Sequence, residues 1–410
     1  MKRMLALTLV LLMMVGCLPA FAQGDQVVLR WMTKVENEEE AKQWRELASD
    51  VTKAYPNIVV EMETTDWSGY WTKLPIQLAG GDAPDLLYMH ALRAQDYCKD
   101  YFLNLDPYIA NDPSINIKDF YSGVLGSFTI DNSIYGLPYD FGPYILYYNK
   151  TLFDKYGVKY PDTNTNYEEF LSDCKALTKD GNYGFVFCSS MDYYVPQLLS
   201  DGAEIISSDG KFNVTSDEAV NALQRMADLI NVYGYAPKIA DVSNTVWNWE
   251  MFEGGNIGML IDGPWSVTNV LNYCKFDVGY TTVPSSVKHV TTINGSGFGI
   301  FAGTKHPDEA YKALSVITGA ESQKKLAQWG RALPSRDSVR DYYYESLSSQ
   351  QGLEQAIKDS IEIGIPYYST KKFQEVYSIF NDEMEAVFAG ESTAKDAAAA
   401  IQAQVDAVLG

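Results

Sequence analysis

Residues 27–35 read VVLRWMTKV, an apolar run that is typical of a buried β-strand. The next segment, 38–55, has apolar residues at helical spacing and predicts an amphipathic helix. A second strand is expected over 58–63, and a second helix over 70–79 that stops at a pair of glycines. Residues 85–89, DLLYM, then predict a third strand. This βαβαβ order indicates a largely parallel sheet whose ligand binds beyond the carboxyl ends of the strands.

The same alternation returns later in the chain. The stretch 135–149 is aromatic and is interrupted by glycine and proline, so we interpret it as a crossover between two lobes. Beyond it we expect a helix over 167–178, a strand over 183–188 and a long helix over 216–233. The chain is therefore predicted to contain two α/β units.

The length also favours two lobes, because 410 residues exceed the roughly 250–300 at which a single core stops growing. A glycine-rich segment at 291–303 is the expected return crossing, and 331–338, which contains Pro334, is a candidate third crossing. The expected lobes are 23–140 with 294–336 for lobe 1, and 141–293 with 337–410 for lobe 2.

The N-terminus predicts export. Lys2 and Arg3 precede an apolar run at 4–15, and AFA at 20–22 offers a small-x-small cleavage site. Residues 1–22 are therefore expected to be a signal peptide. The apolar run is shorter than the roughly 20 residues that a membrane-spanning helix needs.

A second fate of the leader concerns Cys17. The sequence MVGC at 14–17 loosely resembles a bacterial lipobox, in which the cysteine is acylated and becomes the first residue. The mature protein is thus expected in the periplasm or another extracytoplasmic space, either free or tethered as a lipoprotein through a lipid on Cys17.

Composition excludes several classes of function. The net charge of -21 makes nucleic acid a poor partner. The three histidines are far apart and show no metal-ligand spacing, so neither a metal nor another cofactor is expected. An even number of cysteines follows the leader, which permits two disulfides, yet none has C-x-x-C spacing. Buried thiols or at most one bridge are expected at Cys98, Cys174, Cys188 and Cys274.

Four segments in a fixed order carry a family resemblance. They read LAGGDAPD at 78–85, YGLPY at 135–139 leading into YYNKTLF at 147–153, FEGGNIGM at 252–259 leading into DGPW at 262–265, and GSGFGI at 295–300. In this order and spacing they resemble the extracellular solute-binding proteins of family 1, the sugar-binding proteins of ABC transporters that include the maltose-binding proteins.

The resemblance implies a type II periplasmic-binding-protein fold, in which two α/β lobes are joined by hinge crossings with a ligand cleft between them. It also implies the function of a substrate-binding component in sugar transport. Such a protein is a monomer that binds a mono- or oligosaccharide and delivers it to the membrane permease of an ABC importer.

The turn DGPW at 262–265 holds the leading candidate for ligand binding. In similar proteins the tryptophan of this turn stacks on the sugar, so Trp265 is expected to do so. Asp262 either accepts hydrogen bonds from hydroxyl groups or closes the turn. Tyr377 matches a tryptophan that forms a stacking wall in maltose-binding proteins and keeps an aromatic face.

Candidates on the other lobe follow its strands. After the third strand, His90 and Arg93 lie where similar proteins present a tryptophan, an aspartate and an arginine, and only Arg93 keeps the type. The loop after the second strand presents a stacking candidate, Trp67. The residue before it, Asp66, either binds ligand or caps the next helix.

Further candidates lie near the first strand, the crossings and later loops. Polar side chains there are plausible partners for hydroxyl groups, with helix starts, core packing or ion pairing as the alternatives. Glycine near a cleft lets backbone amides approach a ligand closely. These candidates are Glu36, Asn37, Tyr139, Asp140, Asp192, Tyr193, Gly295, Ser296 and Arg331.

Two rival functions are weighed against sugar binding. A polyamine would need acidic groups between aromatic faces, which Asp66, Asp140, Asp192 and Asp262 could supply. A glycoside hydrolase would need two suitably spaced carboxylates. No G-x-S-x-G, H-E-x-x-H or Walker sequence occurs, and no catalytic residue is expected.

The expected mechanism is hinge closure. Trp265 and Tyr377 on one lobe and Trp67 and Arg93 on the other are predicted to grip the ligand together, so that the closed state gains contacts that the open state lacks.

Overall fold

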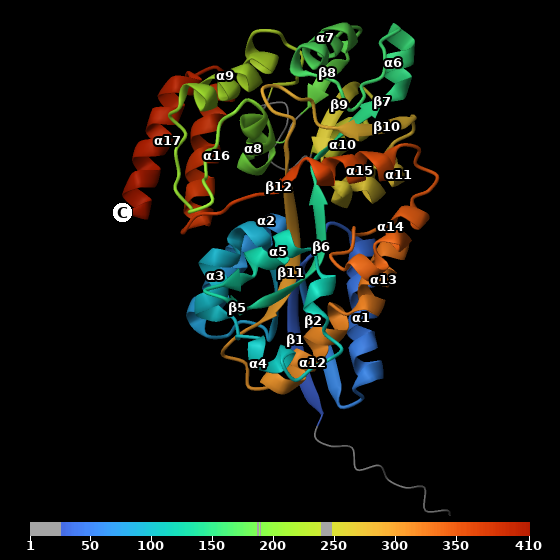
Figure 1. The fold of residues 1–410 in the computed structure, drawn as a ribbon, viewed down its shortest axis with the longest axis vertical. Coiled ribbons are helices and arrows are strands. Elements are labelled where there is room, and N and C mark those ends of the chain that lie inside the picture. Colours follow the sequence, from blue (N-terminus) through green and yellow to red (C-terminus); the bar gives the residue numbers. More distant parts are fainter. Residues whose placement is uncertain (1–25, 187, 189, 239–247) are drawn as a thin grey trace, which may run out of the picture.

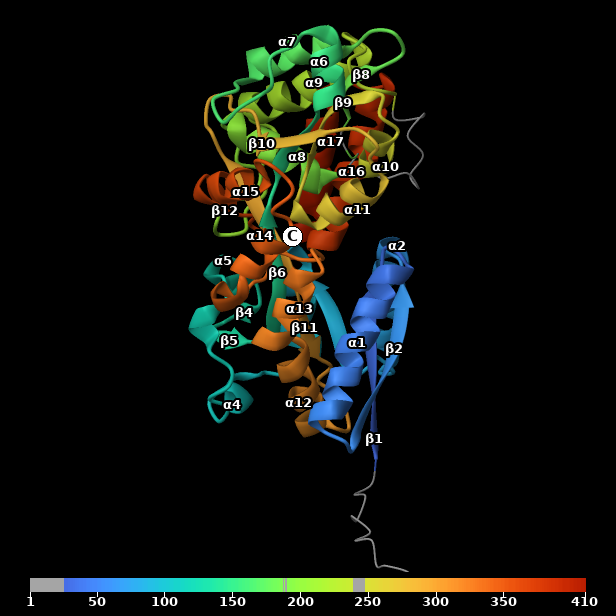
Figure 2. The same ribbon diagram turned by 90° about the vertical axis from the view of Figure 1, so that its right-hand side faces the viewer.

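The computed structural model describes residues 26–186, 188, 190–238 and 248–410. The predicted signal peptide and the predicted lipid site at Cys17 lie outside these residues. Figures 1 and 2 show two lobes, one above the other, with the chain passing between them along β6, β11 and the segment around β12.

The first lobe is built on a 6-stranded sheet with the order β12-β11-β3-β1-β2, in which β6 pairs with β11 on a separate path. The three strands predicted near the N-terminus are confirmed, and both β2 and β3 run parallel to β1. The strands are β1 (Val27–Lys34), β2 (Ile58–Thr65), β3 (Leu86–His90), β6 (Gly136–Pro143), β11 (Thr291–Ile300) and β12 (Gly364–Pro366).

Helices cover this sheet where the sequence predicted them. α1 (Glu38–Ala54) begins because the Asn37 side chain accepts a hydrogen bond from Glu40 N, and its apolar face is buried. α2 (Trp67–Gly80) ends at Gly81, whose φ of 68° suits glycine. The other helices and a small hairpin of this lobe are η1 (Ala91–Arg93), α3 (Ala94–Tyr101), α4 (Asp106–Ile109), η2 (Ile117–Asp119), α5 (Ser122–Ser127), β4 (Thr129–Ile130), β5 (Ser133–Ile134), α12 (Pro307–Ile317), α13 (Ala320–Gln328), η5 (Asp337–Val339) and α14 (Asp341–Ser346).

The second lobe has a 4-stranded sheet with the order β10-β7-β9-β8. Only β8 and β9 pair in parallel, because β7 is antiparallel to both of its neighbours. Its elements are β7 (Ile145–Asn149), α6 (Lys150–Tyr156), α7 (Tyr167–Leu177), β8 (Tyr183–Val186), α8 (Met191–Ser200), α9 (Asp217–Asn231), α10 (Asn248–Glu253), β9 (Ile257–Asp262), η4 (Pro264–Ser266), α11 (Val267–Tyr273), β10 (Val278–Thr282), α15 (Leu353–Glu362), α16 (Phe373–Ala389) and α17 (Ala394–Leu409).

Two segments concern the predicted crossings. The segment 331–338 was expected to cross between the lobes, but it lies along β6, with a bridge between Asp140 and Pro334. α14 then packs against α13. The glycine-rich segment at 291–303 forms β11, whose pairing with β6 begins at Ile293. The predicted limits of the two lobes stay predictions.

The described part of the chain contains no helix that is long and apolar enough to cross a membrane. The four cysteines within it are free thiols: Cys98 and Cys174 are buried, whereas Cys188 and Cys274 are half-buried.

Candidate functional site

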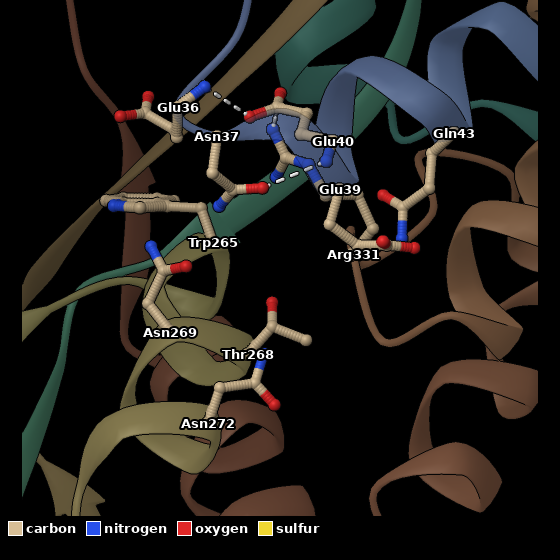
Figure 3. A pocket seen from close by; sticks show the side chains of 10 residues that line it. All are labelled: Glu36, Asn37, Glu39, Glu40, Gln43, Trp265, Thr268, Asn269, Asn272 and Arg331. Carbon is tan, nitrogen blue, oxygen red and sulfur yellow. Dashed lines mark hydrogen bonds and ion pairs between the residues drawn. The ribbon is translucent and has the colours of Figure 1, made fainter.

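A cavity lies where α1 of the first lobe faces α11 of the second (Figure 3). Its volume of about 50 Å³ is well below the roughly 300 Å³ at which small-molecule pockets begin. The lining residues are Glu36, Asn37, Glu39, Glu40, Gln43, Trp265, Thr268, Asn269, Asn272 and Arg331.

The first-lobe wall of the cavity is organised around Glu40. Its carboxylate accepts hydrogen bonds from Arg331 Nη2, from Trp44 Nε1 at 3.2 Å and from Glu36 N at 2.8 Å. Burial would raise the pKa of Glu40, but the charges of Arg331 and Lys34 outweigh it and hold that pKa at about 2. Arg331 Nε is buried without a hydrogen-bond partner in the described ranges, so this guanidinium keeps one donor unused.

The second-lobe wall is the turn that carries Trp265. Asp262 closes this turn, because its carboxylate accepts hydrogen bonds from Gly263 N at 2.7 Å and from Ser266 Oγ at 3.0 Å. Tyr193 OH adds a third, at 3.1 Å. Trp265 is half-buried and presents its ring toward the loop that holds Asn37 (Figure 3). The fully buried Asp262 therefore shapes the site instead of lining it.

A second cluster surrounds Arg93, which is only 1% exposed. Its guanidinium carbon lies 5.3 Å from the ring centroid of Trp67 and 4.5 Å from that of Trp71, both on α2. From the second lobe, the Phe373 and Tyr377 rings of α16 lie at 5.8 and 4.9 Å. Four aromatic rings from two lobes thus enclose one cation, an arrangement that is favourable when the charge is desolvated.

Two polar atoms near this cage have unused capacity for hydrogen bonds. Arg93 Nε donates to Gln374 Oε1 at 2.7 Å, but Arg93 Nη1 has no partner among the residues that the structure describes. Asp192, at the start of α8, is 8% exposed, and its Oδ1 likewise finds no partner there. Burial raises the pKa of Asp192 to about 6, and the charge of Arg93 opposes that rise.

The two clusters are connected by aromatic rings. Tyr144 makes edge-to-face contacts with Tyr193, at 5.1 Å between centroids, and with Trp265, at 5.3 Å. Because Tyr193 follows Asp192 in α8, one continuous wall runs from the Arg93 cage to the cavity beside Trp265.

Several predicted residues have structural roles. Asp66 caps α2 by accepting from Gly69 N at 2.6 Å. Tyr139 is 1% exposed and stacks on Phe298 in the core of the first lobe. Asp140 accepts from Ser296 N at 2.6 Å, and Ser296 Oγ is bonded to Tyr88 OH, so this pair holds the sheet together.

Gly295 and His90 also lie in packed surroundings. A side chain at Gly295 would lie 2.7 Å from Asp140 O, so close packing of β6 on β11 requires glycine there. His90 packs edge-on against Trp67 at 5.5 Å, and burial, with the nearby charge of Arg93, lowers its pKa well below the usual value.

Some lining residues were missed by the sequence interpretation, although helical spacing could have found part of them. Asn269 and Asn272 follow Trp265 at intervals of four and seven residues, and Trp71 follows Trp67 at four. Glu40 and Gln374 carry no such signal, because the arginines that they bind, Arg331 and Arg93, come from distant parts of the chain.

Comparisons with known proteins agree with this architecture. The sequence profile described as bacterial extracellular solute-binding protein matches residues 46–353. The maltodextrin-binding protein MdxE of Bacillus subtilis is 22% identical over 404 residues, which covers 94% of this chain and 92% of that protein.

Two solved structures show the same fold. An ABC substrate-binding protein from Listeria monocytogenes in complex with cycloalternan superposes with a TM-score of 0.89 at 23% identity, covering 94% of this chain and 100% of that one. The maltose-bound MalE3 of T. maritima gives a TM-score of 0.81 at 21% identity, covering 93% and 100%. The predicted type II periplasmic-binding-protein fold is thereby confirmed.

Proposed function

This chain belongs to the bacterial extracellular solute-binding proteins, and from this premise we propose that it is the substrate-binding component of an ABC importer that captures a mono- or oligosaccharide. The two lobes close on the sugar by a hinge motion, and the closed protein delivers it to the membrane permease subunits. The proposal includes export by the signal peptide at 1–22, with an optional lipid on Cys17, and action as a monomer without catalysis.

The observation that carries the proposal is a matched pair of unused atoms on opposite lobes. Arg93 Nη1 can only donate and Asp192 Oδ1, when ionised, can only accept, and neither has a partner among the described residues. A sugar hydroxyl donates one hydrogen bond and can accept two, so the hydroxyls of one sugar can satisfy both atoms. Because each atom is buried, leaving it unpaired costs about 1–3 kcal/mol, which ligand binding would recover.

The cavity supplies the other half of a sugar site. Trp265 offers a flat apolar face, and Asn37, Asn269 and Asn272 offer amide groups that both donate and accept. This combination suits a pyranose ring, whose faces carry C–H groups and whose rim carries hydroxyls. Maltodextrin and cycloalternan, which appear in the names of the two relatives above, are ligands of this kind.

The geometry disfavours a polyamine. The aromatic cage that would receive an ammonium group is already filled by the Arg93 guanidinium, which repels a second cation. Of the acidic candidates, Asp66 caps a helix and Asp262 closes a turn. A hydrolytic role has equally little support, because Asp262 and Asp140 are committed to hydrogen bonds within the protein.

A thermal-shift panel tests the proposal with glucose, mannitol, maltotriose and spermidine. A ligand at 100 times its dissociation constant stabilises the folded state by about 2.7 kcal/mol, so a binding sugar raises the melting temperature measurably. We expect a response to at least one sugar, and a response to spermidine alone would overturn the carbohydrate proposal.

Variants then locate the site. Asp192→Asn should reduce the response to the sugar, because it replaces the carboxylate opposite Arg93 with a neutral amide. Asp209→Asn is the matched control, since that aspartate is exposed and pairs with Lys211 on the surface of the same lobe. Equal responses of both variants would remove Asp192 from the site.

A further inference from the structure

A short segment of the first lobe is embedded in the second lobe beside the Arg93 cage. Leu92, in η1, is 1% exposed and packs within the apolar core of the second lobe. Ser369 Oγ donates to Leu92 O at 2.5 Å, and the Arg93–Gln374 hydrogen bond lies next to it. The two lobes are therefore joined here by direct hydrogen bonds between their side chains and backbone.

Asp96 adds an unusual contact to this junction. It lies on α3 of the first lobe, and its Oδ2 accepts a hydrogen bond from Gln374 N, in the first turn of α16, at 3.1 Å. The amides of Lys372 and Phe373 interact with the same carboxylate. The N-terminal amides of a helix lack partners inside the helix, so the first turn of α16 obtains its acceptor from the opposite lobe.

The helix does not cap itself. Lys372 occupies the N-cap position with a φ of 54°, and within the described chain its side chain makes no capping bond. A carboxylate at this end is also attracted by the positive end of the helix dipole. A 17-residue helix packed in the second lobe thus depends on a first-lobe side chain for its start.

We propose that Asp96 is a positioning residue for ligand capture, an N-cap that reaches across the lobes and holds α16 in the closed arrangement. α16 carries Gln374 and Tyr377, and both contact Arg93. Asp96 therefore acts on the cleft through α16 and the Arg93 cage, without touching the ligand. This inference rests on the hinge closure in the proposed function and is independent of the ligand's being a sugar.

The contact is selective for closure because a hydrogen bond tolerates little displacement. A donor–acceptor distance of 3.1 Å leaves only a few tenths of an ångström before the bond is lost, whereas separating the lobes moves α3 and α16 apart. We expect the ligand-free protein to form this bond part of the time and the closed form to hold it throughout. A bond that is more populated in the closed form strengthens the binding of any ligand that needs closure.

The first experiment is hydrogen exchange of the amides at 372–374 in the ligand-free protein, compared between wild type, Asp96→Ala and Asp96→Asn. Asparagine caps helices as well as aspartate does, whereas alanine does not. We expect exchange to be at least threefold faster in Asp96→Ala and near wild type in Asp96→Asn. Equal exchange in wild type and Asp96→Ala would overturn the proposal.

The second experiment measures affinity by calorimetry, using the panel sugar with the largest thermal shift. Asp96→Ala should weaken binding about three- to tenfold, which is the range of a lost helix cap, and Asp96→Asn should stay within twofold of wild type. The matched control is Thr393→Ala, because Thr393 caps α17 entirely within the second lobe. That variant should lower the melting temperature and leave the dissociation constant unchanged.

Three outcomes decide between the possibilities. If Asp96→Ala lowers stability and leaves the dissociation constant unchanged, as Thr393→Ala should, the cap is merely structural and the proposal fails. If no panel sugar binds the wild type, the carbohydrate function fails, but the ligand-free exchange still decides on Asp96. Should Asp96→Ala not fold, wild type alone decides: protection at 372–374 must rise at least threefold when the sugar saturates the protein, and unchanged protection overturns the inference.

Discussion

The Arg331 guanidinium and the Glu40 carboxylate form an ion pair inside the cleft wall, with side-chain exposures of only 9% and 3%. The pair joins the first turn of α1 to the loop after α13, which are distant in sequence. Because removing one partner of a buried pair leaves the other charge uncompensated, this contact should matter more than any surface ion pair of the protein.

Glu40→Gln should therefore lower the free energy of unfolding by about 3 kcal/mol at pH 7. Urea denaturation measures this change. Glu46→Gln is the control on the same helix, because Glu46 is half exposed where it pairs with Lys325 and should change stability by less than about 1 kcal/mol. Equal losses in the two variants would show that burial of the Glu40 pair has no special weight.

The contribution of Glu40 should also depend on pH. Its pKa is lowered from 4.5 to about 2 in the folded protein, so the unfolded chain binds the proton more tightly. The stabilisation is then present above about pH 4.5 and is lost as the pH falls toward 2. The difference between wild type and Glu40→Gln in urea denaturation should shrink between pH 6 and pH 3, and a constant difference would contradict this assignment.

Asp192 should show the opposite sign. Burial raises its pKa to about 6, so its ionised form destabilises the folded state as the pH rises through that value. Asp192→Asn should raise the free energy of unfolding by about 1–2 kcal/mol at pH 7.5 and by little at pH 4.5. The same variant should weaken sugar binding at least tenfold, or about 1.4 kcal/mol. A gain of stability without a loss of affinity would mean that Asp192 is not a ligand contact.

Trp265→Ala should weaken sugar binding at least tenfold without unfolding the protein, because the ring is half-buried and contacts the cavity. Trp265→Phe should retain part of the affinity through its smaller aromatic face. Isothermal calorimetry compares both with Tyr233→Ala, an exposed aromatic position of the same lobe that does not line the cavity. An unchanged dissociation constant in Trp265→Ala would remove the ring from the site.

Much of the fold was predictable because its signals are local. The strand at 27–35, the helix that follows it and the stop at Gly81 each depend on residues within a few positions of one another. The segment 331–338 was misjudged because its pairing partner, β6, is almost two hundred residues away, and no local pattern distinguishes a crossing from an extra strand edge.

The candidate site was predictable in part, where its residues follow a strand or a turn, as Glu36 and Asn37 do. Trp265 was found because DGPW directs the chain out of the sheet, and the same turn correctly raised the question of whether Asp262 closes it. The cage around Arg93 was found in part, through Trp67 and Tyr377, whereas Trp71 and Phe373 were missed. The set of aromatic rings around the Arg93 guanidinium depends on how the two lobes pack against each other. No single segment of the sequence encodes that packing.

The arrangement of the crossing strands has a mechanical consequence. β6 and β12 both pair with β11, so the connections between the lobes form one hydrogen-bonded ribbon instead of separate tethers. Such a ribbon bends perpendicular to its strands far more easily than its strands slide past one another. The lobes therefore have one easy direction of relative motion. Every approach of one cleft wall to the other then follows the same arc, and residues as distant in sequence as Arg93 and Gln374 meet in the same register each time.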